Sequence, residues 1–239
     1  MKPYYEDDFV TLYHGDCLEV TEWLEADVLV TDPPYGIAHR DKRSSGATRE
    51  ERLRRSQERH AAGTAYISND HDTGVRDKML ALWDVRPGLV FGSWRRPRPK
   101  HTVQRLIWHK TDPGTGLSSP DSHPWISKDE EIYVIGERMG AFGNGRVDGN
   151  VYTTDEIRGA YTSQIGHPTP KPIALMGKLL DKCQREWTIA DPFAGSGSTL
   201  VAAKQLGRRA IGVELEEKYC EIAAQRLSQD VLDLEGLTA

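Results

Sequence analysis

A short stretch of the sequence combines an acid, two prolines and a tyrosine. Asp32-Pro33-Pro34-Tyr35 follows directly after the apolar run Val28-Leu29-Val30. Such a run is typical of a buried parallel strand. Proline donates no ladder hydrogen bond and keeps the preceding residue out of the helical region, so the chain must leave this strand in a stiff, extended turn.

That turn directs the Asp32 carboxylate, the Asp32 and Pro33 carbonyl groups and the Tyr35 ring beyond the carboxyl end of the strand, where open α/β sheets bind ligands. These oxygens can accept the two hydrogens of an exocyclic amino group, while the tyrosine stacks on the ring that carries it. The pattern favours recognition of a flat, amino-bearing heterocycle. An ordinary strand-ending turn with a surface tyrosine is the alternative.

A second stretch, Asp191-Pro192-Phe193-Ala194-Gly195-Ser196-Gly197-Ser198-Thr199, has the composition of a ligand-binding loop. Gly195 and Gly197 let a ligand approach the backbone closely at the start of a helix. The stretch lacks the lysine of a phosphate-binding P-loop and the full spacing of a dinucleotide fingerprint. Glu214 strengthens the interpretation, because it ends a predicted strand at the distance downstream where nucleotide folds place the acid that binds a ribose diol.

A third stretch, His167-Pro168-Thr169-Pro170-Lys171-Pro172, precedes another predicted helix. Thr169 is a natural N-cap, and Pro170 is a natural residue of the first turn. A helix N-terminus can bind a carboxylate through its free N–H groups and its dipole, and Lys171 adds a positive charge. The alternative is a capped helix with a surface lysine.

With these three stretches in this order, the sequence resembles the beta-class amino-methyltransferases of DNA, which transfer a methyl group from S-adenosylmethionine (AdoMet) to adenine N6 or cytosine N4. The resemblance extends from about Leu12 to Leu227 and is weakest in the middle of the chain. It implies one Rossmann-like α/β domain over residues 1–239, with a circularly permuted motif order and a mostly parallel seven-stranded sheet flanked by helices. In that sheet the strand before Asp191 lies next to the strand before Asp32.

The resemblance also implies a mechanism for Asp32, Pro33, Pro34 and Tyr35. The target base would be flipped out of the duplex and stacked on Tyr35, and Asp32 and the Pro33 carbonyl would accept its amino hydrogens during direct methyl transfer. An aspartate at the first position resembles adenine enzymes more than the Ser-Pro-Pro-Tyr of many cytosine-N4 enzymes. We therefore expect adenine N6, with cytosine N4 as the alternative; methylation of RNA or a protein amide, or a silent DNA-binding subunit, are further alternatives.

The AdoMet site implied by the resemblance has three parts. Asp16 would bind the adenine amino group of AdoMet beside the Cys17 backbone, although Asp16 is also explained as a plain N-cap. The turn after His167 would hold the methionine part, and Glu214 the ribose. The expected cofactor-binding residues are Asp16, Cys17, His167, Thr169, Lys171, Asp191, Phe193, Ala194, Gly195, Ser196, Gly197, Ser198, Glu214 and Leu215.

Basic residues gather in two segments, although the net charge is −5. Residues 38–66 are rich in Arg, Glu, Ser and Gly, so we predict a mobile charged loop, which is either solvated or a flap that clamps phosphates. Residues 94–110 contain Lys and Arg but no acid, and begin with a basic, proline-stiffened loop that is either a DNA contact or an exposed turn. Trp108 is either a wall of the base pocket or a core residue. The expected DNA-binding residues are Arg40, Lys42, Arg43, Arg95, Arg96, Arg98, Lys100, Trp108 and Lys110.

Size and composition fit a single enzyme domain. The chain has 239 residues, and its mean hydropathy is −0.59. It has no apolar run that could span a membrane, and its polar N-terminus is unlike a signal peptide. Cys17, Cys183 and Cys220 are too scattered for a disulfide frame or a zinc site, so we expect reduced thiols in a cytoplasmic protein without a metal. Double-stranded DNA is the expected partner; a homodimer and a cognate restriction enzyme are left open.

The elements that must position these residues follow from apolar patterning and turn residues. Strands are predicted over residues 10–14, 27–31, 88–93, 103–108, 131–135, 187–190 and 210–214. Helices are predicted over residues 17–24, 75–83, 173–185, 198–206 and 219–227. The glycine-rich segment 136–166 is predicted to be irregular, and the resemblance implies that it is a small target-recognition insertion.

Overall fold

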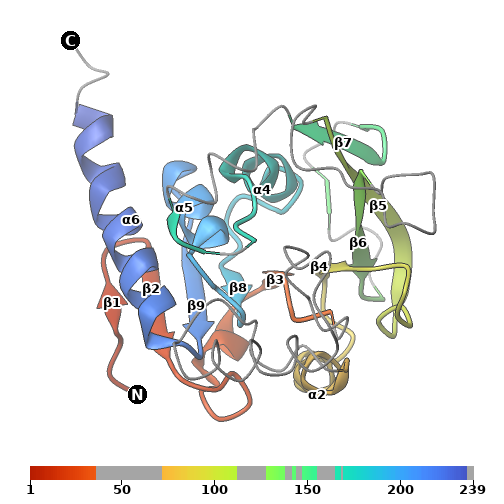
Figure 1. Cartoon of the computed structure of the whole chain (residues 1–239), viewed down its shortest axis with the longest axis horizontal. Helices are drawn as coiled ribbons and strands as arrows, with labels where there is room; N and C mark the ends of the chain where they lie inside the picture. The colour runs from red at the N-terminus through yellow and green to blue at the C-terminus, as the bar shows by residue number, and fades with distance from the viewer. Residues whose placement is uncertain are drawn as a thin grey trace, which may run out of the picture.

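A mixed sheet runs through the centre of the molecule, which is described by a computed structural model (Figure 1). The structure describes residues 1–35, 72–111, 128–137, 142–143, 147–154, 165–167 and 169–235. The strands are β1 (Tyr5–Glu6), β2 (Val10–His14), β3 (Val28–Thr31), β4 (Gly88–Gly92), β5 (Thr102–Lys110), β6 (Asp129–Ile135), β7 (Val151–Thr154), β8 (Ile189–Asp191) and β9 (Ala210–Glu214). The helices are the 3₁₀ helix η1 (Glu22–Glu25), α2 (Gly74–Trp83), α4 (Ile173–Leu180), α5 (Ser198–Gln205) and α6 (Glu217–Glu235).

The order of the strands creates a ligand-binding crevice at the centre of the sheet. The order is β1-β2-β9-β8-β3-β4-β6-β5-β7, and strands β2, β9, β8, β3 and β4 are parallel neighbours. From β8 the chain continues through α5 to β9 on one side, whereas from β3 it continues through α2 to β4 on the other. The carboxyl ends of β3 and β8 therefore form a switch point, where open α/β sheets bind ligands. The predicted adjacency of these two strands is confirmed.

Two hydrophobic layers cover the sheet. One combines α4, α5 and α6 with residues such as Leu175, Leu200 and Leu227. The other combines η1 and α2 through Trp23, Met79 and Trp83, with the rings of Trp23 and Trp83 stacked at 5.8 Å. Burial of apolar side chains on both faces explains why β3 and β4 consist of uninterrupted buried residues. The central strands therefore have little freedom to move the loops at their ends.

Among the described residues, the sheet has two strands more than the seven predicted. All seven predicted strands are present, and β1 and β7 extend the two edges. β7 lies inside the segment 136–166 that was predicted to be irregular, and it pairs in parallel with β5. Its sequence Val-Tyr-Thr-Thr consists of aromatic and β-branched residues, which favour strands even in a run this short.

The predicted helix over residues 17–24 is wrong. Asp16 accepts hydrogen bonds from the N–H groups of Leu18, Glu19 and Val20 and so closes a turn. The carbonyl of Cys17 accepts the Trp23 indole N–H at 2.9 Å, so a side chain takes the acceptor that a helix would use. Only the 3₁₀ helix η1 then forms before β3.

The predicted helix over residues 173–185 is shorter and begins differently. It ends at Leu180, because the buried Arg208 guanidinium takes the carbonyl oxygens of residues 180, 183, 184 and 187. Pro172, not Thr169, occupies the N-cap position. The Thr169 N–H instead donates to His167 Nδ1 at 3.2 Å. Lys171 therefore precedes the helix, in the loop that crosses the carboxyl edge of the sheet.

Several predictions fall outside the described residues. These include the charged loop over residues 38–66 with Arg40, Lys42 and Arg43. Parts of the insertion 136–166 also lie outside them. Among the described residues, no helix is both long enough and apolar enough to cross a membrane. Cys17, Cys183 and Cys220 are buried free thiols, and burial is the main cause that raises the pKa of each to about 12.

Candidate active site

The Asp32–Tyr35 turn extends the line of β3 to the switch point. Thr31, the last residue of β3, is fully buried, and its hydroxyl donates to Asp191 Oδ1 at 2.7 Å. This bond joins the end of β3 to the end of β8. The two prolines fix the backbone that follows, and the partly buried Tyr35 packs against the hydrophobic core. The turn is therefore held by the sheet at one end and by the core at the other.

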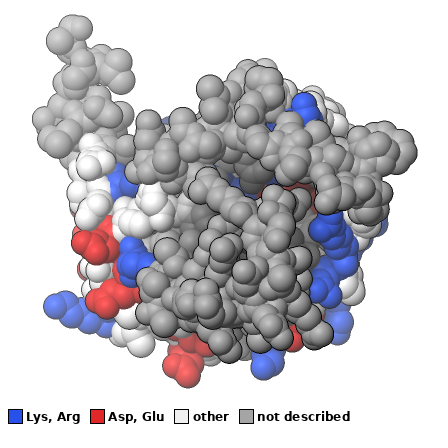
Figure 2. Space-filling model, in the orientation of Figure 1, with Lys and Arg blue, Asp and Glu red and all other residues white. Residues whose placement is uncertain are grey.

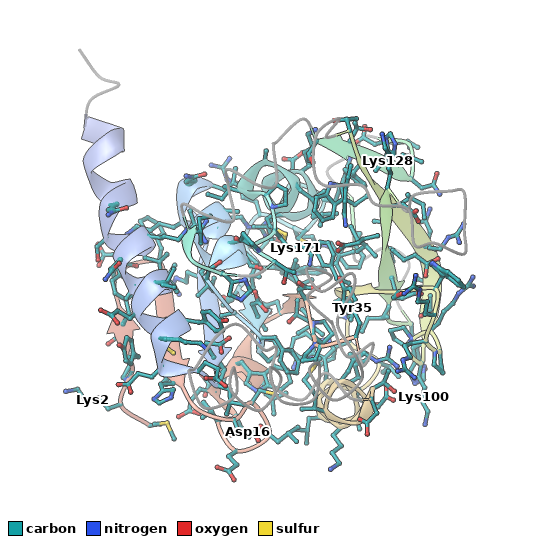
Figure 3. All side chains as sticks on the ribbon, viewed as in Figure 1. Lys2, Asp16, Tyr35, Lys100, Lys128 and Lys171 are labelled. Atoms are coloured by element: carbon teal, nitrogen blue, oxygen red, sulfur yellow. The ribbon has the colours of Figure 1, made fainter. Side chains whose placement is uncertain are left out.

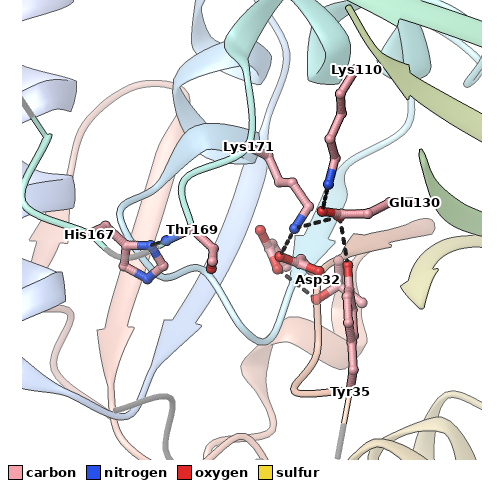
Figure 4. A network of polar contacts seen from close by, with 9 residues as sticks. Asp32, Tyr35, Lys110, Glu130, His167, Thr169 and Lys171 are labelled. Carbon is pink, nitrogen blue, oxygen red and sulfur yellow. Dashed lines mark hydrogen bonds and ion pairs between the residues drawn. The ribbon is translucent and has the colours of Figure 1, made fainter. Parts of the chain in front are cut away.

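The Asp32 carboxylate lies in a network of charged groups (Figure 4). Asp32 Oδ2 forms an ion pair with Lys171 Nζ, which also lies 3.3 Å from Glu130 Oε2. The Tyr35 hydroxyl donates to Glu130 Oε2 at 3.1 Å. Lys110 Nζ forms an ion pair with Glu130 Oε1. Two carboxylates and two ammonium groups thus balance one another around the tyrosine.

One oxygen of Asp32 is left available. Asp32 Oδ1 is buried and has no hydrogen-bond partner among the described residues. Burial raises the pKa of Asp32 above its ordinary value, and the charge of Lys171 opposes this shift. A buried carboxylate oxygen without a donor is costly unless a ligand supplies one. The site is therefore suited to a ligand that donates a hydrogen bond at this point.

Buried side chains fix the glycine loop that follows β8. Asp191 is 2% exposed, and its Oδ1 accepts the Thr31 hydroxyl and the Phe193 N–H. Gly197 has φ +80°, and a Cβ there would lie 2.9 Å from Ala223 Cβ, so both the backbone and the space require glycine. Arg226 of α6 donates to the Ser196 carbonyl at 2.5 Å. These contacts fix the loop against α6 and leave Phe193 at its exposed edge.

Glu214 ends β9 with its carboxylate bound to two backbone N–H groups. Oε2 accepts from Gly195 at 2.7 Å and Oε1 accepts from Glu216 at 2.8 Å. Burial raises the pKa of Glu214, and these two hydrogen bonds oppose the shift. The side chain therefore joins the glycine loop to the carboxyl end of β9 and presents its remaining lone pairs at the switch point.

His167 lies between the glycine loop and α6. Its ring contacts Tyr219 edge-on at 4.4 Å between centroids, and a Cβ on Gly195 would lie 3.1 Å from its Nε2. Burial, with help from Lys171, lowers the pKa of His167 to about 4. Because Nδ1 accepts the Thr169 N–H, the neutral ring carries its proton on Nε2, as a donor.

All of these segments meet around one cavity of about 310 Å³, a size within the range of ligand pockets. Figure 3 shows Tyr35 and Lys171 near the centre of the molecule, with Asp16 at the lower rim. Of the predicted catalytic and cofactor residues, the cavity is lined by Asp16, Cys17, Asp32, Pro33, Pro34, Tyr35, His167, Thr169, Lys171, Phe193, Glu214 and Leu215.

The other predicted cofactor residues lie behind this lining. Asp191, Ala194, Ser196 and Ser198 are buried, and Gly195 and Gly197 are covered by His167 and Ala223. Their contacts shape the loop without reaching the cavity. Lys171 lines the cavity, but its ammonium points to Asp32 and Glu130 and not along the axis of α4.

The predicted DNA-binding residues that the structure describes divide into three groups. Arg95, Arg98 and Lys100 are exposed and Arg96 is half-buried, all in the loop between β4 and β5. Figure 2 shows basic side chains along the right flank of this face. Lys110 is instead paired with Glu130. Trp108 is 2% exposed in the core and donates to Thr154 Oγ1, so its placement matches the core alternative and it reaches neither the cavity nor the surface.

Three residues at the site were missed from the sequence. Glu130 lies in β6, one residue before the strand predicted over residues 131–135, so it was not considered as a site residue. Arg226 lies on the polar side of α6, and nothing in the sequence pattern indicated that it contacts the glycine loop. Trp94 is 67% exposed at the cavity rim, with the Arg95 guanidinium 5.5 Å from its ring centroid; an exposed tryptophan beside basic residues was a usable signal.

The fold and this cavity define a Rossmann-like α/β enzyme with its ligand site at the switch point of the sheet. Comparison with known proteins specifies the family. A family model described as DNA methylase, for N6 and N4 methyltransferases, matches residues 95–225, which is more than half of the chain.

Relatives are similar over nearly their whole length. The type II methyltransferase M2.LlaDCHI of Lactococcus lactis subsp. cremoris is 27% identical across 95% of this chain and 93% of its own. The type II methyltransferase M.ScaI of Streptomyces caespitosus is 27% identical across 98% and 86%, respectively. Among solved structures, the M1.HpyAVI–SAM complex has a TM-score of 0.58 at 20% identity and covers 92% of this chain and 100% of that chain. The cytosine-N4-specific PvuII DNA methyltransferase has a TM-score of 0.59 at 16% identity and covers 97% and 93%.

The chain therefore belongs to the DNA methylase family of N6 and N4 amino-methyltransferases. The resemblance to the beta class is confirmed, with the Asp32 turn early and the glycine loop late in the chain. The protein is an AdoMet-dependent DNA methyltransferase.

Proposed function

We propose that this enzyme methylates the exocyclic N6 of adenine in double-stranded DNA. The observation that carries the proposal is that the Asp32–Tyr35 turn and the Asp16, Phe193 and Glu214 side chains line one cavity. The turn offers acceptors for an amino group, and the other three residues offer the chemistry that binds a nucleoside. Donor and acceptor sites are thus adjacent, as direct transfer requires.

The catalytic turn would bind the flipped base by its amino group. Asp32 Oδ1, which is buried without a partner among the described residues, accepts one amino hydrogen, and the Pro33 carbonyl accepts the other. The base stacks on Tyr35, whose ring is fixed through its hydroxyl by Glu130. Two acceptors in fixed positions localise the nitrogen lone pair toward the cavity side that holds the cofactor.

Bound AdoMet would supply the methyl group, which would bond to the amino nitrogen while the electrons of the broken S–C bond return to sulfur. The nitrogen then loses one proton, and Asp32 is the carboxylate placed to accept it. Burial raises the pKa of Asp32, which makes it a better base than an exposed aspartate. Such a base contributes typically about 10²–10⁴-fold to the rate.

The cofactor residues fit AdoMet by their chemistry. Glu214 ends β9 with a buried carboxylate of the kind that binds a ribose diol, and the Asp16 carboxylate can accept from an adenine amino group. Phe193 offers an aromatic face beside them. His167 carries an N–H donor for the methionine carboxylate.

The loop between β4 and β5 would contact the DNA backbone. It lies at the cavity rim, carries Arg95, Arg96, Arg98 and Lys100, and is held by the buried Arg76, which donates to the Pro97 carbonyl at 3.1 Å. Arginines and lysines on a rigid loop bind phosphates with little ordering cost.

Cytosine N4, RNA and a protein amide are the other candidate substrates. Cytosine N4 presents the same amino group, and the fold is shared with a cytosine-N4-specific enzyme. We favour adenine because Asp32, and not serine, begins the Pro-Pro-Tyr turn. RNA or a protein amide would use the same acceptors, but the basic rim and the type II relatives favour DNA and a role in restriction-modification.

The test is to incubate the protein with methyl-labelled AdoMet and DNA, RNA or protein, and to digest the labelled DNA to nucleosides. We expect label in N6-methyladenine. Label in N4-methylcytosine would refute the choice of base and keep the enzyme class, and label in RNA or protein alone would refute the substrate. Sequencing of modified DNA from expressing cells gives the recognition sequence in the same experiment.

A further inference from the structure

The Lys171 ammonium lies between two carboxylates in the wall of the cavity. It forms an ion pair with Asp32 Oδ2 and lies 3.3 Å from Glu130 Oε2, and its side chain is 8% exposed (Figure 4). Burial lowers the pKa of Lys171, but the two carboxylates outweigh this and hold the pKa above its ordinary value. Lys171 therefore stays charged and requires a carboxylate partner at every stage of the reaction.

The ion pair with Lys171 competes with the proposed role of Asp32 as a hydrogen-bond acceptor and base. A carboxylate that already holds an ammonium group is less basic and a weaker acceptor for an incoming amino group. One Asp32 oxygen is free among the described residues, but the other is taken by Lys171. Asp32 gains its full acceptor strength only when Lys171 moves away from it.

Glu130 is held in place to receive that lysine. Its Oε1 is paired with Lys110 of the neighbouring strand β5, and its Oε2 accepts from the Tyr35 hydroxyl. The distance of 3.3 Å to Lys171 Nζ is longer than the roughly 2.7–2.9 Å of a good charge-assisted hydrogen bond. A shift of the lysine by about half an ångström would complete this bond and lengthen the one to Asp32.

We propose that Glu130 is a positioning residue that takes Lys171 from Asp32 when the target amino group binds, and so frees Asp32 to accept the amino hydrogen. The inference rests on the proposed function. Glu130 acts through Lys171; its hydrogen bond from the Tyr35 hydroxyl can be kept by the amide oxygen of a glutamine, so Glu130→Gln tests the Lys171 role.

The test begins with Glu130→Gln, which keeps the shape of the side chain and removes its charge. With saturating AdoMet and DNA we expect kcat to fall about 10–100-fold, the range for loss of a hydrogen bond to a charged group. The Kd for AdoMet should stay within about twofold, because Lys171, the proposed cofactor residue that pairs with Glu130, keeps Asp32 as its partner. Thermal melting in the same buffers reports any general loss of structure.

The pH dependence of kcat separates a positioning role from a structural one. The described charged and titratable groups that face Asp32 are Lys171, Glu130, Tyr35 and Asp191. The negative charge of Glu130 raises the pKa of Asp32, so its removal should lower that pKa. The acid limb of the kcat profile should therefore move to lower pH in Glu130→Gln, while the plateau falls.

A double-mutant cycle tests whether the effect passes through Lys171. In a Lys171→Met background, adding Glu130→Gln should change kcat by less than about threefold, because the group that Glu130 positions is gone. Multiplicative effects of the two substitutions would overturn the proposal.

Asp7→Asn is the matched control. It removes a partly buried carboxylate from the ion pair with the buried Lys204, at 2.6 Å, near the β1 edge of the sheet. It should lower stability and leave kcat and the acid limb unchanged. If the wild-type enzyme is active and Glu130→Gln keeps its kcat or its acid limb unchanged, the Glu130 proposal alone is overturned. A wild-type protein without methyl transfer to DNA overturns the proposed function, and the inference with it.

Discussion

Replacement of Asp32 by Asn separates catalysis from cofactor binding in this enzyme. The amide keeps an oxygen that accepts one hydrogen bond, but it has lost the charge that pairs with Lys171 and the basicity that takes the proton. We expect kcat to fall about 10²–10⁴-fold, which is the usual contribution of a general base. The Kd for AdoMet should change by less than about threefold, because Glu214, Asp16 and Phe193 are untouched.

The cost in stability follows from the same contacts. Removal of one partner from a buried ion pair costs about 3–5 kcal/mol when the other charge is left alone. Lys171 is not left alone, because Glu130 Oε2 lies 3.3 Å away. We therefore expect a loss of only about 1–2 kcal/mol in the free energy of unfolding, well below the uncompensated value.

Three measurements on Asp32→Asn check this reasoning. Nucleoside analysis after a single turnover gives the chemical rate, calorimetry gives the Kd for AdoMet, and urea unfolding gives the stability. Turnover within tenfold of wild type would remove Asp32 from its proposed role. A parallel loss of AdoMet affinity would show that the turn supports the cofactor site, and a loss of 4 kcal/mol or more would show that Glu130 does not compensate for the missing partner.

Three further predictions concern the cofactor site, the link between β3 and β8, and the cavity rim. Glu214→Gln should raise the Kd for AdoMet about 10–100-fold in calorimetry, since it loses charge-assisted hydrogen bonds; an unchanged Kd would contradict the ribose role. Burial raises the pKa of Asp191 to about 6 from 3.8, so the folded state binds more protons than the unfolded state between these values. Wild-type stability should therefore fall, relative to Asp191→Asn, by about 2 kcal/mol as pH rises from 4 to 7; parallel urea-unfolding curves would contradict this. Trp94→Ala should raise the KM for DNA about 3–30-fold and leave AdoMet binding unchanged, because an exposed ring at the rim can stack on a base; equal KM values would exclude that contact.

The parts of the fold that the sequence predicts are those determined by local pattern. All seven predicted strands form, because apolar runs between turn residues have few other ways to be buried. The site segments were found for a similar reason: the prolines after Asp32 and the glycines around Ser196 restrict the backbone by themselves. The carboxyl ends of parallel strands then bring such segments together.

The parts that were missed depend on contacts between distant residues. The end of α4 is set by Arg208, which takes the carbonyl oxygens of the following turn from 21 or more positions away. The missing helix after Asp16 depends on the Trp23 indole. Glu130 becomes part of the site only because β5 and β6 bring Lys110 beside it, a pairing that no local pattern of charges specifies.

The pairing of β2 with β9 and of β3 with β8 has a consequence for how the protein is made. During synthesis β2 and β3 leave the ribosome with one unpaired edge each, and their partners β9 and β8 follow roughly 160–200 residues later. At a typical 5–20 residues per second, these apolar edges wait about ten seconds or more for their partners. We therefore expect the central sheet to form completely only after β8 and β9 have left the ribosome. Until then, we expect the nascent chain to bind chaperones that shield β edges.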